Sequence, residues 1–171
     1  MRTMSRVQFE IRTPGVADIN ALADMFFEIH EKPSEEYGAC TREAGVEWAK
    51  SFCDEKTPRV LEGKPVHALT LFIDKRALGW ATVIEDSPRV GGRGWYLNGL
   101  EVRPYCRNNG LGAALVQALA SLVRMHDRDL YVAVRRDHPS SLKMFRNCGF
   151  GDVQNIGHFA PTVSVMVRKK G

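Results

Sequence analysis

The sequence predicts a mixed α/β (α+β) domain, in which a central sheet of six to seven strands is flanked by about four helices. Two apolar segments separated by a short turn, 66–73 and 78–84, indicate an antiparallel hairpin. Beyond residue 94, strand and helix patterns alternate, which is typical of a sheet with helices on both faces. The 171 residues carry no internal repeat or linker, so we expect a single domain over 1–171.

The N-terminal part of the chain predicts one strand followed by two helices. Residues 7–12 alternate between apolar and polar side chains, as in a strand. Thr13-Pro14 is a helix-start signal, because proline is tolerated in the first turn, and apolar residues then recur at helical spacing until Pro33. A second helix is predicted over about 41–53.

The C-terminal part predicts further strands at 95–102 and 130–134, each followed by a helix. The first helix is indicated by leucines and alanines at helical spacing over 111–122, and the second begins at Pro139 and ends at Gly149. Residues 162–167 alternate once more, so one or two strands are expected after Phe150.

Composition narrows the class of protein. The formal net charge is +4, and no stretch approaches the roughly 20 apolar residues of a membrane span. The N-terminus has no apolar run typical of a secretory signal, so we expect a cytoplasmic protein. The four cysteines are widely spaced and form no zinc pattern with histidines; reduced thiols and no metal site are expected.

The stretch 100–115 carries the clearest chemical signal. A predicted strand ends at Val102, and a loop with two asparagines and two glycines leads into a helix. Unpaired N–H groups at a helix start attract phosphate, Gly110 and Gly112 allow close approach, and Arg107 adds a cation. The stretch therefore predicts a pyrophosphate site, although the glycines would also suit a plain turn. The expected ligand contacts are Leu100, Glu101, Val102, Arg107, Asn108, Asn109, Gly110, Leu111, Gly112 and Ala113.

Two common phosphate-binding motifs do not fit this stretch. A dinucleotide fingerprint needs a third glycine where Leu115 stands, and a P-loop needs Gly-Lys-Ser/Thr where the chain has Gly112-Ala113-Ala114. The pattern R-x-x-G-x-G from Arg107 to Gly112 instead resembles the acyl-CoA signature of the GCN5-related N-acetyltransferase (GNAT) superfamily.

A second motif strengthens the resemblance. Residues 138–150 are similar to the GNAT pattern N-x-x-A-x-x-L-Y-x-x-x-G-F at every spacing, with His138 in place of Asn, Ser141 of Ala and Phe145 of Tyr. The resemblance covers 95–150 in detail and the whole chain in element order. It implies that these three residues also contact the cofactor.

The resemblance implies a GNAT fold, with acetyl-CoA as co-substrate and its pantetheine arm between two diverging central strands. The implied activity is N-acetyl transfer by direct attack of an amine, either a small molecule or a peptide. A homodimer is compatible with it, since many family members dimerise. Neither nucleic acid nor a membrane is expected as a partner.

Three devices familiar from the family are missing. Phe145 replaces the tyrosine that serves as general acid, and phenylalanine cannot donate a proton. Ala133 stands where members acting on protein N-termini often carry a glutamate. Asn98-Gly99 stands where polyamine-acetylating members carry an acidic pair.

The remaining catalytic candidates are Tyr96, Asn98 and Glu28. Strand alternation places Tyr96 and Asn98 on one face with Leu100 and Val102, and directs Glu101 away as a structural or solvated residue. The resemblance implies that the first two helices and their connector wall the acceptor site. Acidic residues in the connector would suit a cationic amine there, or would form a solvated loop. His30 is a candidate base. The connector residues concerned are Glu28, His30, Glu31, Glu35, Glu36 and Tyr37.

Two alternative functions stay open at this point. The missing tyrosine and glutamate suit a non-catalytic acyl-CoA-binding or sensor domain. The positive net charge alone would suit a protein directed at nucleic acid, such as a tRNA-acetylating enzyme.

Overall fold

The computed structural model describes residues 9–32, 40–54, 56, 59–154, 156 and 159–171. The α-helices in these ranges are α1 (Ile19–His30), α2 (Arg42–Cys53), α3 (Leu111–Met125) and α4 (Pro139–Asn147). The strands are β1 (Phe9–Arg12), β2 (Val60–Leu61), β3 (Lys64–Ile73), β4 (Arg76–Ile84), β5 (Trp95–Val102), β6 (Leu130–Arg135), β7 (Gly151–Val153) and β8 (Val163–Arg168). Short 3-10 helices are η1 (Val16–Asp18), η2 (Pro88–Val90) and η3 (Pro104–Cys106).

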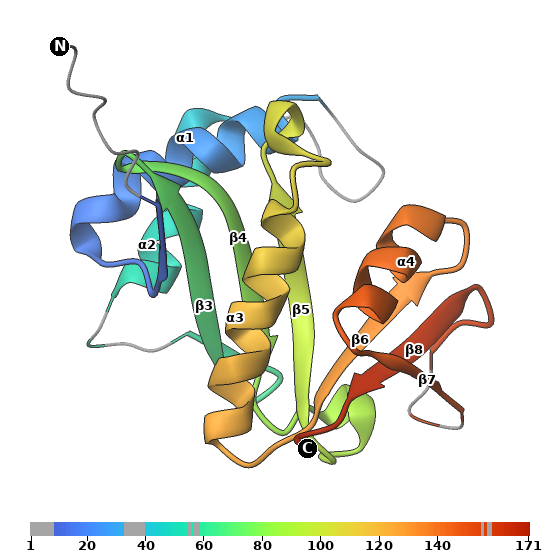
Figure 1. Cartoon of the computed structure of the whole chain (residues 1–171). Coiled ribbons are helices and arrows are strands. Elements are labelled where there is room, and N and C mark those ends of the chain that lie inside the picture. Colours follow the sequence, from blue (N-terminus) through green and yellow to red (C-terminus); the bar gives the residue numbers. More distant parts are fainter. Residues whose placement is uncertain (1–8, 33–39, 55, 57–58, 155, 157–158) are drawn as a thin grey trace, which may run out of the picture.

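The strands form one mixed sheet in the order β1-β3-β4-β5-β6-β8-β7, with β2 paired to β3 (Figure 1). The β5–β6 pair is parallel and the other pairs are antiparallel. The predicted mixed sheet is confirmed. The described sheet has eight strands rather than six or seven, because the two residues of β2 are too few to show alternation in the sequence.

Helices cover both faces of the sheet, as predicted. Figure 1 shows α3 and α4 on one face and α1 and α2 on the other. The main core lies under α3 and α4 and contains Leu115, Leu119 and Phe145, while a second core packs α1 and α2 against Trp80 and Phe72. Thr41 caps α2, since its Oγ1 accepts a hydrogen bond from the Ala44 N–H at 3.2 Å.

The predicted helix start at Thr13 is wrong, because α1 begins only at Ile19. Between them, the Asp18 carboxylate accepts hydrogen bonds from the Gly15 N–H (2.8 Å) and from Arg12 (2.6 Å). This side chain holds the segment in a 3-10 turn, so the proline signal marks a turn that precedes the helix.

The strands β5 and β6 pair only at their first residues and then diverge (Figure 1). The paired residues are Trp95 with Leu130 and Tyr96 with Tyr131. Beyond Tyr96, the edge of β5 that faces β6 therefore has no partner among the described strands. Its backbone N–H and C=O groups are available to another extended group.

A β-bulge changes the direction of the β5 side chains. Opposite β4, Leu97 pairs with Val83 and Gly99 with Thr82, so Asn98 is an extra residue on β5. Before the bulge Trp95 and Leu97 pack in the main core; after it Leu100 and Val102 pack there. Odd-numbered residues of β5 therefore face the main core before the bulge, and even-numbered residues face it after the bulge.

Candidate active site

The loop from β5 to α3 ends at a helix start that has no side-chain cap. Gly110 has a φ of 78° and occupies the N-cap position of α3, where it provides no side-chain cap. The Ala114 N–H donates to the Gly110 carbonyl at 3.0 Å, and the N–H groups before Ala114 have no partner within the helix. A helix start of this kind retains donors and partial positive charge for an anion.

A cavity of about 360 Å³ lies at this helix start, between α3 and the first turn of α4. The Arg107 Nε donates to the Val102 carbonyl at 3.1 Å, which holds the cationic side chain beside the end of β5. A Cβ added at Gly112 would lie 3.3 Å from Met144 Sδ, a tight contact, so the glycine gives this wall of the cavity more room. The cavity therefore offers hydrogen-bond donors, the cationic side chain of Arg107 and a backbone that a ligand can approach closely at Gly112.

Nine of the residues expected from the sequence line this cavity. They are Leu100, Val102, Arg107, Asn108, Gly110, Leu111, Gly112, Ala113 and Ser141. The cavity is also lined by Cys106, Ser140 and Met144, which were not among the expected contacts. Ser140 and Met144 lie one helical turn apart, so the helical period of α4 could have identified them.

Four expected cofactor contacts lie elsewhere. Phe145 is 4% exposed and packs edge-on against Phe150 at 5.3 Å between ring centroids, in the core. His138 is an exposed residue before α4, and Asn109 lies outside the cavity lining. The side chain of Glu101 contacts α1 on the other face of the sheet.

The predicted face shared by Tyr96, Asn98, Leu100 and Val102 is wrong, because the bulge at Asn98 reverses the alternation. Tyr96 is buried in a cluster with Ile84 and Tyr131, and burial raises the pKa of its hydroxyl. The exposed Asn98 accepts a hydrogen bond from Arg89 at 3.2 Å. The same guanidinium lies 5.4 Å from the centre of the Tyr96 ring, so the two candidates are neighbours of one arginine.

Glu28 is not brought together with Tyr96 and Asn98. Its carboxylate pairs with Arg103, a buried residue whose Nε also donates to the Ala77 carbonyl at 2.7 Å. Glu28 lines a separate cavity, between α1 and the β3–β4 turn. The other connector residues Glu35, Glu36 and Tyr37 lie outside the described residues.

His30 and Glu101 meet on the α1 side of the sheet. His30 Nε2 lies 3.2 Å from Glu101 Oε2, and the Trp80 indole Nε1 donates to the same oxygen at 2.8 Å. A carboxylate only accepts, so the first contact requires the proton on Nε2. Sequence reasoning could not find this contact, because its members come from α1, β4 and β5.

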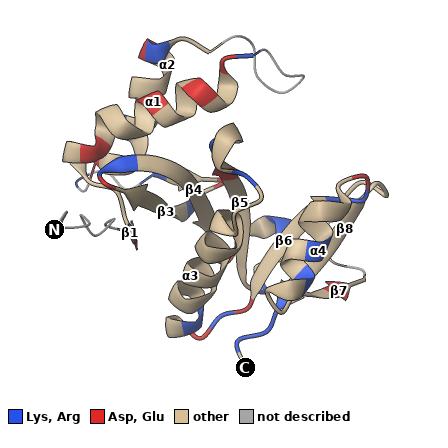
Figure 2. Cartoon of the chain, turned by 45° about the horizontal axis from the view of Figure 1, so that its top comes forward, with Lys and Arg blue, Asp and Glu red and all other residues tan. Residues whose placement is uncertain are grey.

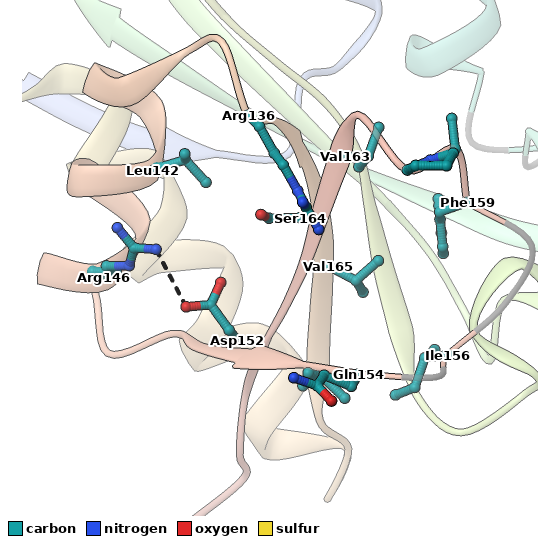
Figure 3. A pocket seen from close by; sticks show the side chains of 13 residues that line it. Arg136, Leu142, Arg146, Asp152, Gln154, Ile156, Phe159, Val163, Ser164 and Val165 are labelled. Carbon is teal, nitrogen blue, oxygen red and sulfur yellow. Dashed lines mark hydrogen bonds and ion pairs between the residues drawn. The ribbon is translucent and has the colours of Figure 1, made fainter.

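A larger cavity, of about 790 Å³, lies beyond α4 beside β7 and β8 (Figure 3). There Arg146 pairs with Asp152 at 3.2 Å, and Arg136 extends across the front of Ser164. No described helix begins at this cavity, so it lacks the unpaired N–H groups of the α3 start. The smaller cavity is therefore the better site for a phosphate-containing ligand, despite its volume.

The residues that the structure describes contain no group of three His, Cys, Asp or Glu side chains arranged to hold a metal ion. Within the same ranges, none of the helices has the length and apolar character needed to span a bilayer.

The sequence model of the acetyltransferase (GNAT) family matches residues 23–150. Among curated proteins, none matches the sequence significantly.

Many solved structures share the fold. An acetyltransferase from Thermus thermophilus superposes with a TM-score of 0.67 and 21% identity, covering 94% of this chain and 96% of its own. The PaiA N-acetyltransferase of Thermoplasma acidophilum, solved with coenzyme A, gives 0.63 and 16%, covering 95% and 99%. The ribosomal-protein-S18-alanine N-acetyltransferase of Escherichia coli gives 0.61 and 15%, covering 94% and 93%. At these identities the likeness shows a common fold.

Proposed function

The chain belongs to the acetyltransferase (GNAT) family, and on that premise we propose that it transfers an acetyl group from acetyl-CoA to an amine acceptor. The observation that carries the proposal is the start of α3. Uncapped N–H groups, Arg107 and two glycines converge there on one cavity. Such a cavity fits a pyrophosphate, which coenzyme A carries.

The divergence of β5 and β6 supports the proposal that the rest of the cofactor lies between these two strands. Beyond Tyr96 the free edge of β5 offers backbone donors and acceptors, which suit the two amides of a pantetheine arm. Leu100 and Val102 line the same cavity as the phosphate site, so one extended ligand would contact both. We assign Ser140 and Ser141 to the opposite wall.

The proposed reaction is a direct acyl transfer. When bound, acetyl-CoA supplies an activated thioester carbonyl. The amine loses a proton and attacks that carbon; the C–N bond forms, the C–S bond breaks, and the thiolate leaves and is protonated. A free backbone N–H of β5 would stabilise the developing oxyanion, and Tyr96 and Asn98 remain candidates for contact with substrate.

Isothermal titration calorimetry of the purified protein with acetyl-CoA, free CoA and NAD tests the cofactor site. We expect binding of acetyl-CoA and CoA and no response to NAD. Release of CoA thiol during incubation with a broad panel of amines then tests catalysis. Absence of any acetyl-CoA binding would contradict the whole proposal.

The absence of the family tyrosine at Phe145 favours one alternative, a non-catalytic acyl-CoA-binding or sensor domain. The same two measurements separate the alternatives. Tight acetyl-CoA binding without CoA release from any amine would support a sensor, whereas turnover would establish the enzyme.

A further inference from the structure

Glu101 is a carboxylate held in place by two hydrogen-bond contacts. Its Oε2 accepts the Trp80 indole N–H at 2.8 Å and lies 3.2 Å from His30 Nε2. Among the described residues, no lysine or arginine forms an ion pair with it. Both contacts fall on one oxygen, so Oε1 is left to interact with another group, and the side chain remains 27% exposed.

The position of Glu101 relates this carboxylate to the cofactor cavity. Its neighbours in sequence, Leu100 and Val102, line that cavity, whereas the Glu101 side chain lies on the opposite face, against α1. Beyond Tyr96, β5 does not pair with β6, so a group bound at Glu101 reaches the proposed cofactor around this open edge of the strand. A second substrate that approached from the α1 side would meet this carboxylate.

The surrounding charges favour a cation at this position. On α1, the Glu28 carboxylate forms an ion pair with the buried Arg103, and within the described residues this arginine forms no ion pair with Glu101. Figure 2 shows acidic residues along α1, while basic residues gather on α4 and the C-terminal segment. A partly buried carboxylate is stabilised by a charged hydrogen-bond donor, and an ammonium group supplies three.

We propose that Glu101 binds the ammonium group of the acceptor, and that the acceptor is a cationic amine without a carboxylate beside its amino group. This inference rests on the proposed acetyl transfer. A carboxylate next to the reacting nitrogen would be repelled by Glu101, so α-amino acids are poor substrates. Trp80 and His30 are positioning residues, since they hold the carboxylate.

The proton balance of this step is simple. The bound ammonium transfers one proton to the Glu101 carboxylate, and the neutral amine attacks the thioester carbon. The nitrogen loses a second proton after the C–N bond forms, and the departing thiolate takes up one proton. Glu101 returns its proton to solvent, so one proton is released per acetyl group transferred.

Matched pairs of substrates test the proposal: 2-phenylethylamine with phenylalanine, tyramine with tyrosine, and cadaverine with lysine. In the wild-type protein we expect kcat/KM for each amine to exceed that of its amino acid at least tenfold. Glu101→Gln keeps an acceptor for the Trp80 indole but removes the charge. It should lower kcat/KM for the amines at least tenfold, with the Kd of acetyl-CoA changed less than twofold.

Two further variants test the positioning role of Trp80 and provide a control for the loss of a carboxylate. Trp80→Phe, which removes the indole donor, should cause a smaller loss in kcat/KM and leave acetyl-CoA affinity unchanged. Glu47→Gln removes an exposed carboxylate from α2 and should change neither quantity. If the wild type acetylates the amines and Glu101→Gln has a kcat/KM within twofold of the wild-type value, the inference is overturned. The proposed function would then stay intact.

A binding measurement keeps the two proposals separate if no amine is acetylated. In ¹H–¹⁵N spectra of the CoA-bound protein, the Trp80 indole signal is identified by its loss in Trp80→Phe. Added 2-phenylethylamine should shift that signal in the wild type and not in Glu101→Gln. A shift without turnover would support the binding site while contradicting the proposed enzyme; no shift in the wild type would overturn the inference.

Discussion

At the scale of single residues, Gly112 is the position where an added side chain most directly tests the cofactor site. Gly112→Glu would place a bulky negative group against Met144, inside the cavity proposed to hold a pyrophosphate. We expect acetyl-CoA binding to weaken by about 1–3 kcal/mol, roughly fivefold to 150-fold in Kd. Calorimetric titration measures this change.

The matched control is Gly151→Glu, where a Cβ meets nothing within 4 Å and which lies outside the cofactor cavity. It should bind acetyl-CoA like the wild type. Equal affinity of Gly112→Glu and the wild type would mean that the pyrophosphate lies elsewhere.

Phe145→Tyr tests whether the missing hydroxyl matters for catalysis. Because Phe145 is buried against Phe150, the new hydroxyl would enter an apolar core without a partner. We expect little change in turnover and a loss of about 1–3 kcal/mol in the free energy of unfolding. Denaturant unfolding and CoA-release assays measure the two effects, with Phe159→Tyr, on the other face of the sheet, as control. A large gain in turnover would instead place residue 145 beside the reacting thiol.

The cofactor loop could be predicted from the sequence because its chemistry is local: strand, glycine-containing loop and helix start are contiguous from Leu100 to Ala113. The acceptor side could not be predicted in the same way. One extra residue at Asn98 reverses the strand alternation, and the adjacent Gly99 was the only local sign of a bulge. The Glu101 contacts join three distant segments, which no local pattern reports.

At the scale of elements, the link between β1 and α1 gives a pH-dependent contribution to stability. The Arg12 guanidinium, bonded to both Asp18 oxygens at 2.6 and 2.9 Å, holds the pKa of that carboxyl below its usual value. The stabilisation is therefore complete above the unfolded pKa of about 3.9 and is lost as the pH falls through the lower folded pKa.

Asp18→Asn keeps an acceptor for the Gly15 N–H and removes only the charge. We expect it to lower the free energy of unfolding by about 1 kcal/mol between pH 5 and 7, since Arg12 is partly exposed. The difference from wild type should shrink below about pH 4. Urea unfolding at several pH values measures it. Arg12→Gln should cause a similar loss with no further loss in the double variant; additive losses would show that the pair is not coupled.

Elements in which apolar residues recur at regular spacing over many residues were predictable from the sequence. Elements that depend on a single side chain or a single strand pairing were not. The helical leucines of α3 and the alternating valines of β8 indicate these elements without tertiary contacts. By contrast, β2 exists because Val60 and Leu61 pair with β3, and η1 exists because Asp18 accepts hydrogen bonds from Gly15 and Arg12. Neither cause is visible as a period in the sequence.

At the scale of the whole molecule, the sheet consists of two parts joined by a short parallel pairing. β1, β3, β4 and β5 form one part with α1, α2 and α3, and β6, β8 and β7 form the other with α4 (Figure 1). The two residue pairs between β5 and β6 are the strand contacts across the junction. A ligand bound in the divergence would therefore bridge both parts.

This bridging predicts a distinctive pattern of hydrogen exchange. In the free protein, backbone amides on the β6-facing edge of β5 beyond Tyr96 pair with none of the described strands and should exchange rapidly. Saturating acetyl-CoA, at about 100 times its Kd, should raise the free energy of unfolding by about 2.7 kcal/mol and slow exchange along this edge and at the start of α4. Gly112→Glu at the same ligand concentration should show less protection. Protection confined to residues 106–113 would mean that the ligand occupies only the phosphate site and does not extend between the strands.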